Sequence, residues 1–264
     1  MIRIAEEKDK NLILNILRKN IIDNIYLYID IFVFGLDKEY MRVWVNEEQK
    51  NINQIILKYY DSFQIYSKNN SFEAIIDLIL DHKPSMISGS ENVIREIHEE
   101  LSSYYNASYG VVLEQEKIKM CENNNVPTLA ILEDMEEIAE LICIDKGIGG
   151  HYTAEILKEQ LSSRFQEKMG RNYIIKIEDK IVAHYGTYAE ISDVAVMGGL
   201  IVHPSYRGQG YAKILHTYLS NILIDEEKRV FLFCQEDVLK MYLSLGSKIR
   251  GRYGKLTINN EREI

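Results

Sequence analysis

The sequence predicts an α/β protein whose second half forms a mixed central sheet flanked by helices, with a second mixed α/β domain at its N-terminus. Three observations predict this fold class. An apolar strand runs through a proline and a glycine loop into a helix at residues 194–225. A strand hairpin precedes it, and apolar residues recur at helical spacing on both sides. The 264 residues are enough for one large domain or two ordinary ones.

Composition and charge limit the kinds of partner that the protein is expected to bind. Hydrophobic residues make up 46% and charged residues 27%, which is typical of a soluble globular protein. The net charge of -9 disfavours nucleic acid, because an acidic surface repels phosphates. The apolar run from Ile25 to Leu36 contains Asp30 and is too short to cross a bilayer. The N-terminal stretch does not resemble a signal peptide, so we expect a cytoplasmic protein with no membrane partner.

The cysteines indicate no redox or metal chemistry. Cys121, Cys143 and Cys234 are odd in number and far apart, which argues against a disulfide framework or a CxxC metal site. We expect them to be buried apolar side chains.

The turn-rich stretch Cys121–Leu129 is the best candidate for a domain boundary, because three asparagines and a Val-Pro pair interrupt the periodic segments. We therefore expect domains at residues 1–125 and 126–264. The first half contains no chemical motif. Its expected elements are helices at Asn11–Ile22 and Ser71–Leu80, and strands at Tyr40–Asn46 and Ile55–Ser67. Residues 85–101 are expected to form a short strand, a glycine turn and a helix.

The second half follows the order helix, helix, strand, strand, strand, helix, strand, helix, strand. A hairpin is expected at Asp179-Lys180, and the strand at 194–202 is apolar throughout, which implies burial on both faces. The other expected elements are a helix at 133–145, a loop at Gly147–Thr153, a helix at Thr153–Met169, strands at 172–179 and 180–190, and a strand at Val230–Cys234.

The loop Arg207–Gly210 is the strongest candidate for a binding site. Apolar residues from Tyr211 to Leu223 hold one helical face, so the helix begins at the loop. Its first N–H groups have no helical partners and glycines leave them accessible, which suits a pyrophosphate. The loop lacks the Gly-Lys-Ser/Thr of a P-loop, and Lys213 stands where a dinucleotide fingerprint needs a small residue. Taken alone, a plain strand-to-helix turn is an equal alternative.

The surrounding residues resemble the acetyl-CoA signature of the GNAT superfamily of N-acetyltransferases. Val202, Pro204, Arg207, Gly210 and Ala212 fill the family pattern of Leu/Val-x-Pro followed by Arg/Gln-x-x-Gly-x-Gly/Ala. The element order also looks like that of the family, and the resemblance covers Val126 to about Ile258.

The resemblance implies acetyl-CoA as co-substrate and no metal. Gly198-Gly199 would supply the bulge that splays this strand from its neighbour, although plain helix–sheet packing is the alternative. The strand edge that would take the pantetheine arm is Leu200, Ile201 and Val202. The backbone amides that would bind the pyrophosphate are those of Arg207, Gly208, Gln209, Gly210, Tyr211 and Ala212.

The family often uses a tyrosine in the context Tyr-x-x-x-Gly-Phe to protonate the leaving thiolate. Here Tyr242 and Gly246 fit that context, but Ser247 replaces the aromatic residue. An ordinary tyrosine is protonated at neutral pH and can reprotonate a thiolate. Tyr242 is therefore the candidate catalytic residue, with a packing role as the alternative. A backbone N–H near Ile201 or Val202 would polarise the thioester carbonyl.

The general base is open. Glu190 and Asp193 precede the central strand, where some relatives place a carboxylate, but a solvated turn is the favoured interpretation. His184 is expected in the core or a pocket wall, and His203 is expected to be a loop residue.

These features predict an acetyl-CoA-dependent N-acetyltransferase that transfers directly to an unidentified amine in a ternary complex, since no cysteine is visibly activated. The alternatives are a non-catalytic acyl-CoA-binding sensor module, or an acyltransferase for a longer acyl chain. The first half would then be a degenerate GNAT-like fold in a tandem protein, supplying part of the acceptor pocket or a dimer contact. A homodimer is an open alternative, because edge strands in this fold pair between subunits.

Overall fold

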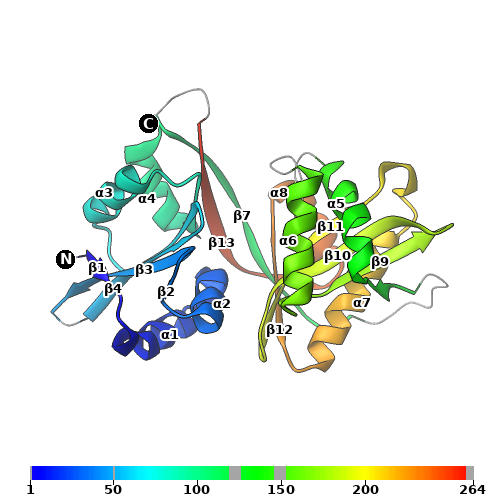
Figure 1. Cartoon of the computed structure of the whole chain (residues 1–264), viewed down its shortest axis with the longest axis horizontal. Helices are drawn as coiled ribbons and strands as arrows, with labels where there is room; N and C mark the ends of the chain where they lie inside the picture. Colours follow the sequence, from blue (N-terminus) through cyan, green and yellow to red (C-terminus); the bar gives the residue numbers. More distant parts are fainter. Residues whose placement is uncertain (1, 50, 119–125, 146–152, 260–264) are drawn as a thin grey trace. The chain divides into compact units, whose positions relative to one another are not determined.

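The computed structural model describes residues 2–49, 51–118, 126–145 and 153–259 (Figure 1). Contacts between Cα atoms divide the chain into two compact units. Unit 1 comprises Met1–Val112, Cys234–Glu236 and Ile249–Ile264, and unit 2 comprises Leu113–Phe233 and Asp237–Lys248. Three strands, β7 (Tyr105–Gln115), β12 (Arg229–Cys234) and β13 (Ser247–Ile258), are therefore divided between the units.

Unit 1 is a mixed sheet with helices. Its strands β1, β3, β4 and β5 pair antiparallel in that order, β6 joins β5 in parallel, and β13 pairs antiparallel with β6. The elements in chain order are β1 (Ile2–Ile4), η1 (Glu7–Asp9), α1 (Lys10–Lys19), η2 (Ile21–Asp23), α2 (Ile25–Phe34), β2 (Asp37–Lys38), β3 (Met41–Glu48), β4 (Asn51–Tyr59), β5 (Ser62–Ser67), α3 (Glu73–His82), β6 (Met86–Ser90), α4 (Glu91–Leu101) and β7 (Tyr105–Gln115).

Unit 2 has the same kind of sheet. Its strands β8, β9, β10 and β11 pair antiparallel in that order, and β12 joins β11 in parallel. The elements are β8 (Thr128–Leu129), η3 (Leu132–Asp134), α5 (Met135–Cys143), α6 (Ala154–Gln166), β9 (Asn172–Ile177), β10 (Lys180–Glu190), β11 (Val194–Val202), η4 (Pro204–Tyr206), α7 (Tyr211–Asp225), β12 (Arg229–Cys234), α8 (Glu236–Ser244) and β13 (Ser247–Ile258).

Helices cover both faces of the unit 2 sheet. The side chains of α5 and α6 pack on one face, against Ile174, Ile181 and Ile201. Helix α7 covers the other face, because the Tyr218 ring meets that of Tyr173, and Tyr173 precedes Ile174 on β9 and so points the opposite way. This arrangement buries β11 on both faces, as its continuous apolar sequence predicts.

The two halves of the chain, residues 2–115 and 128–258, repeat one order of elements. Apart from the two-residue β2, each runs strand, two helices, three antiparallel strands, helix, parallel strand, helix and strand. Their first helices even begin with the same cap. Asp9 accepts the Glu6 N–H at 2.9 Å, and Asp134 accepts the Ile131 N–H at 2.9 Å. The first half is thus a second copy of the fold, as one of the alternatives above anticipated.

Most predicted elements are confirmed, and three are corrected. The run Ile55–Ser67 was predicted as one strand, but it is the end of β4 and the whole of β5, separated at Tyr60 with φ 50°. Helix α2 was missed, because the stretch from Ile25 to Phe34 is apolar all round and shows no helical period. No glycine turn separates β6 from α4, since Gly89 lies inside β6.

The compact units differ from the domain limits expected at 1–125 and 126–264, since β13 returns to unit 1 and β7 ends in unit 2. Cys121 and nearly all of the loop Gly147–Thr153 lie outside the described residues. Among the helices that the structure describes, none combines the length and apolarity needed to span a membrane.

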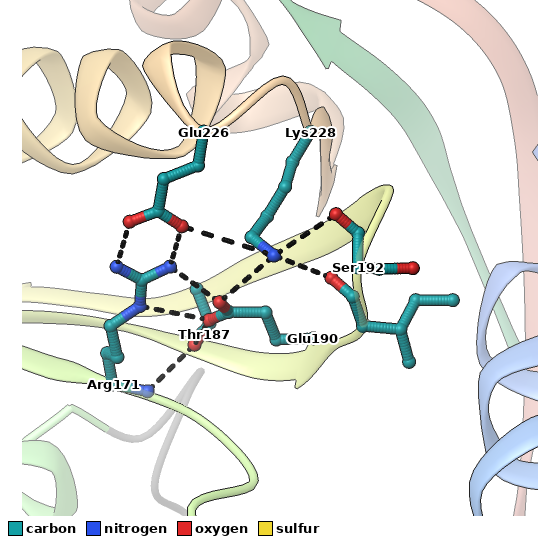
Figure 2. A network of polar contacts seen from close by, with 7 residues as sticks. Arg171, Thr187, Glu190, Ser192, Glu226 and Lys228 are labelled. Carbon is teal, nitrogen blue, oxygen red and sulfur yellow. Dashed lines mark hydrogen bonds and ion pairs between the residues drawn. The ribbon is translucent and has the colours of Figure 1, made fainter.

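An ion-pair network ties together the ends of β9, β10 and α7 (Figure 2). The Arg171 guanidinium donates to both Glu190, with Nε at 3.2 Å, and Glu226, with Nη1 at 2.7 Å. These carboxylates raise the pKa of Arg171, with Glu226 the larger cause. Lys228 donates to the Ile191 carbonyl oxygen at 2.7 Å and lies 3.6 Å from Glu190. The network closes the end of the sheet at which β11 begins.

We expect Arg171→Met to lower the free energy of unfolding by about 2–3 kcal/mol, because it leaves Glu190 and Glu226 with Lys228 as the one remaining cation of the network in Figure 2. Urea unfolding followed by circular dichroism measures this. Lys117→Met is the matched control, since Lys117 and Asp225 form an ion pair in which both side chains are about 60% exposed. The control should cost less than about 0.5 kcal/mol, and equal losses in both variants would contradict the prediction.

Candidate functional site

Strand β11 loses its partner β12 halfway along its length. The parallel pairing runs from Val194, opposite Arg229, to Met197, opposite Leu232. From Gly198 to Val202, β11 pairs only with β10 among the described strands. The edge that would face β12 is therefore open, and an extended ligand can bind such an edge through backbone hydrogen bonds. The predicted strand edge Leu200, Ile201 and Val202 lies within this stretch.

A β-bulge sits where β11 separates from β12. Gly198 pairs with Gly186 and Ile201 with His184, so Gly199 and Leu200 together oppose the single residue Tyr185. Gly199 has φ 69°, and a Cβ there would clash with the Tyr188 hydroxyl. The bulge predicted at Gly198-Gly199 lies one residue further along, at Gly199 and Leu200, and only glycine fits at Gly199.

The backbone of Val202 points its N–H toward the open edge. The next residue, His203, donates its N–H to the Val182 oxygen at 2.8 Å, so His203 faces β10. Because backbone groups alternate along a strand, the N–H and C=O of Val202 face away from β10. Its carbonyl accepts the Arg207 Nε at 3.1 Å. Of the two amides considered for polarising a thioester, Ile201 and Val202, the geometry favours that of Val202.

The glycine loop leads from this edge into helix α7. Gly210 is the N-cap with φ 85°, and Gly208 has φ 79°. A Cβ at either position would meet no atom within 4 Å, so the space beside both glycines is open. Among the described residues, no backbone hydrogen bond is donated by residues 208–213. The start of α7 therefore offers unpaired N–H groups at the positive end of the helix dipole, which suits an anion.

The predicted loop residues contribute in different ways. Arg207 lies 3.4 Å from Asp145 and ties the loop to the end of β11 as well. Tyr211 is buried and donates its hydroxyl to the Gln209 side chain at 3.2 Å. Ala212 is half-buried in the first turn of α7. These loop residues and the strand edge at Leu200, Ile201 and Val202 therefore form one continuous segment of the chain.

Tyr242 lies on α8 against a buried polar network that the sequence did not predict. Its ring is 5.3 Å from that of His216 on α7, and both are buried. His216 Nε2 lies 2.9 Å from Gln115 Oε1. Ser247 also donates to this oxygen. Ser247, which stands in place of the aromatic residue of the family pattern, is thus part of this network.

The network fixes the tautomer of His216. Gln115 donates its amide N–H groups to the carbonyls of Glu116 at 2.7 Å and Leu245 at 3.1 Å, so its oxygen must accept. His216 therefore carries its proton on Nε2. Its Nδ1 is buried and has no hydrogen-bond partner among the described residues. Burial lowers the pKa of His216 to about 4, so the ring is neutral at pH 7.

The remaining candidates take structural roles. Glu190 belongs to the ion-pair network in Figure 2. It lies opposite Ala195, which is seven residues before Val202 on β11, or about 23 Å at about 3.3 Å per residue. It is therefore a structural residue, although it ends a strand and is not a solvated turn residue. His203 accepts the Ser205 N–H at 3.3 Å within the loop, which confirms it as a loop residue. His184 is fully buried, as expected of a core residue.

The equivalent connection in unit 1 lacks this site. Strand β5 pairs with β6 as far as Ile65, two residues before its end. The following segment 68–72 contains no glycine. The buried Gln54 side chain on β4 donates to Ser71 O at 2.7 Å and to Ser67 Oγ at 3.0 Å. These two bonds attach the loop to β4. Only unit 2 combines an open strand edge with a glycine loop among the described residues.

An open strand edge that runs into a glycine-bounded helix N-terminus is a site for an extended ligand with an anionic end. A model of the acetyltransferase (GNAT) family matches residues 94–246, which is more than half of the chain. The chain therefore belongs to the GNAT acetyltransferase family, and family membership implies acyl transfer from acyl-CoA.

Solved structures confirm the fold over the whole chain. An acetyltransferase of the GNAT family from Colwellia psychrerythraea is 15% identical with a TM-score of 0.61, covering 98% of this chain and 100% of its own. A GCN5-related N-acetyltransferase from Sphaerobacter thermophilus is 14% identical with a TM-score of 0.63, covering 97% and 94%. A tandem GNAT protein from the clavulanic acid biosynthesis pathway is 11% identical with a TM-score of 0.63, covering 97% of both chains. The comparison with curated proteins found no match.

The two buried histidines of unit 2 predict a loss of stability in mild acid. Burial lowers the pKa of both His184 and His216 to about 4, whereas an unfolded histidine has a pKa near 6.5. Between these values the unfolded chain binds protons that the folded chain does not, so stability falls as pH falls through this window. At pH 5 each histidine should cost about 2 kcal/mol relative to pH 7.5.

Urea unfolding at pH 7.5 and pH 5 measures this difference. The double variant His184→Gln/His216→Gln replaces both imidazoles with side-chain amides, which can form hydrogen bonds but do not titrate. It should lose less stability than the wild type over the same interval. Equal losses in the two proteins would show that these histidines titrate normally in the folded state.

Proposed function

We propose that this protein is an acetyl-CoA-dependent N-acetyltransferase that transfers the acetyl group directly to an amine in a ternary complex. The observation that carries the proposal is the continuity of the open β11 edge with the amides at the start of α7. The edge suits an extended amide-containing arm, and the amides of Arg207 to Ala212 suit a pyrophosphate. Acetyl-CoA presents these two groups in that order.

The chemical step needs stabilisation of the thioester oxygen and a proton for the departing thiolate. The Val202 N–H faces the open edge and would donate to the carbonyl oxygen, as an oxyanion-hole donor does. Tyr242 would supply the proton as general acid, with its ring placed by contact with His216. Both groups would contribute through where they are placed, so the rate would depend on how the site holds the thioester next to the amine.

The cysteines support direct transfer. Cys234 is buried in the apolar strand β12, and Cys143 is half-buried on α5. Burial raises the pKa of the Cys143 thiol. The Cys143 thiol therefore lacks the lowered pKa that an acetylated nucleophile would need.

A non-catalytic acyl-CoA-binding module is the second candidate. It is favoured by one observation, which is that Glu190 is committed to Arg171 and Lys228 and is not available as a base at the edge. Such a protein would bind acetyl-CoA and release no thiol. An acyltransferase for a longer acyl chain would release thiol faster from the longer substrate.

Binding is tested first by thermal shift with acetyl-CoA and with CoA. At a hundred times the dissociation constant, a ligand stabilises the folded state by about 2.7 kcal/mol. We expect Gly210→Asp to abolish the shift, because the side chain would place a negative charge at the anion site. Gly35→Asp is the matched control, since Gly35 has φ 88° and its added Cβ would meet only Lys10 Nζ at 3.9 Å. No shift in the wild type would refute the proposal.

Catalysis is tested by thiol release from acetyl-CoA with a panel of primary amines. We expect Tyr242→Phe to lower kcat about 10²-fold with little change in KM, because general acid catalysis typically contributes at least that much. Tyr218→Phe, which alters a half-buried tyrosine of α7, should stay within about twofold. An unchanged kcat in Tyr242→Phe would assign Tyr242 to packing. A wild type that binds acetyl-CoA without thiol release would be the binding module.

A further inference from the structure

His184 links three neighbouring strands of unit 2 through its side chain. It lies on β10 and is fully buried. Its Nδ1 is 2.9 Å from the Gly199 carbonyl oxygen on β11, and its Nε2 is 2.9 Å from the Asn172 side chain on β9. A buried polar side chain in the middle of a sheet is costly unless it is fully hydrogen-bonded, as this one is.

The direction of these bonds follows from the acceptor. Burial lowers the pKa of His184 to about 4, so the ring is neutral at pH 7 and carries one N–H. The Gly199 carbonyl can only accept, so this proton lies on Nδ1. Nε2 is then an acceptor, so the Asn172 amide, whose Oδ1 is placed 2.9 Å from Nε2, completes the bond when its O and NH₂ groups are exchanged.

Two glycines leave room for this arrangement. A Cβ on Gly186 would lie 2.8 Å from Asn172 Oδ1, and a Cβ on Gly199 would lie 3.3 Å from His184 Cε1. At both positions the absence of a side chain therefore leaves room for the imidazole and its partner. The contact with Gly199 is made at the bulge itself, where the extra residue interrupts the ladder between β10 and β11.

We propose that His184 is a positioning residue, which donates to the Gly199 carbonyl and thereby fixes the bulge that sets the register of the acyl-CoA-binding edge. A bulge can be lost by sliding β11 one residue along β10. That slip would turn the Val202 N–H from the open edge toward β10, because backbone groups alternate along a strand. The His184 bond holds the extra residue in place and prevents the slip.

The inference rests on the proposed function, and it separates two parts of the ligand. The glycine loop follows η4 and does not contact His184, so the loop would still bind a pyrophosphate after the slip. We therefore expect His184→Leu to weaken acetyl-CoA binding at least tenfold, while binding of ADP, which carries a pyrophosphate and no pantetheine arm, stays within about twofold. Titration calorimetry with the full chain measures both. His184→Gln, whose amide can donate to Gly199, should recover most of the acetyl-CoA affinity.

Gln54→Leu is the matched control, because Gln54 is an equally buried polar side chain that holds a loop carbonyl in unit 1. It should destabilise the fold but leave the ratio of acetyl-CoA to ADP affinity unchanged. If His184→Leu leaves that ratio unchanged, or if His184→Gln binds no better than His184→Leu, His184 is only a core residue and the inference fails.

A measurement on the wild type keeps the inference testable if His184→Leu does not fold. The imidazole nitrogen resonances should show a neutral His184 with its proton on Nδ1, whereas a proton on Nε2 would overturn the bond to Gly199. This readout needs no ligand. A wild type that binds neither acetyl-CoA nor ADP would refute the proposed function, while the tautomer would still report on His184.

Discussion

The separation of β11 from β12 after Met197 is the constraint on which the candidate site depends. A strand that gives up one partner inside a protein leaves a row of backbone groups that must find other hydrogen bonds. Here the bulge at Gly199 bends the strand, and Arg207 satisfies the carbonyl of Val202. The amides that remain are those at the open edge and at the start of α7, and their geometry matches a ligand that is extended at one end and anionic at the other.

The two halves of the chain show how little of a fold has to change to remove such a site. They share the order of their elements and the Asp cap of their first helix. In unit 1, the pairing of β5 continues almost to its end, and Gln54 bonds the loop that follows. Residues 68–72 of that loop all carry side chains, whereas Gly208 and Gly210 leave open space beside the backbone in unit 2. The sheet is a scaffold, and the chemistry lies in one loop and one strand end.

Local signals allowed the second half to be predicted well from its sequence. The apolar period of α7 and the glycines before it located the loop, and paired glycines located the bulge to within one residue. Non-local features could not be predicted. Gln115 is 101 residues from His216, and nothing near either residue indicates their hydrogen bond. The turn at Tyr60 was missed because it contains neither glycine nor proline.

The path of the last strand has a consequence for how the protein is made. Residues Tyr253–Thr257 of β13 pair with Ser90–Met86 of β6, so the sheet of unit 1 is completed by a strand that follows β12 and α8 of unit 2 in the chain. Unit 2 in turn includes Leu113–Gln115, which precede the domain boundary expected at Cys121–Leu129. Neither unit can be completed by cutting the chain once. On the ribosome, β6 is therefore synthesised well before its partner β13, and until β13 arrives this edge of the sheet is exposed to pairing with other strands.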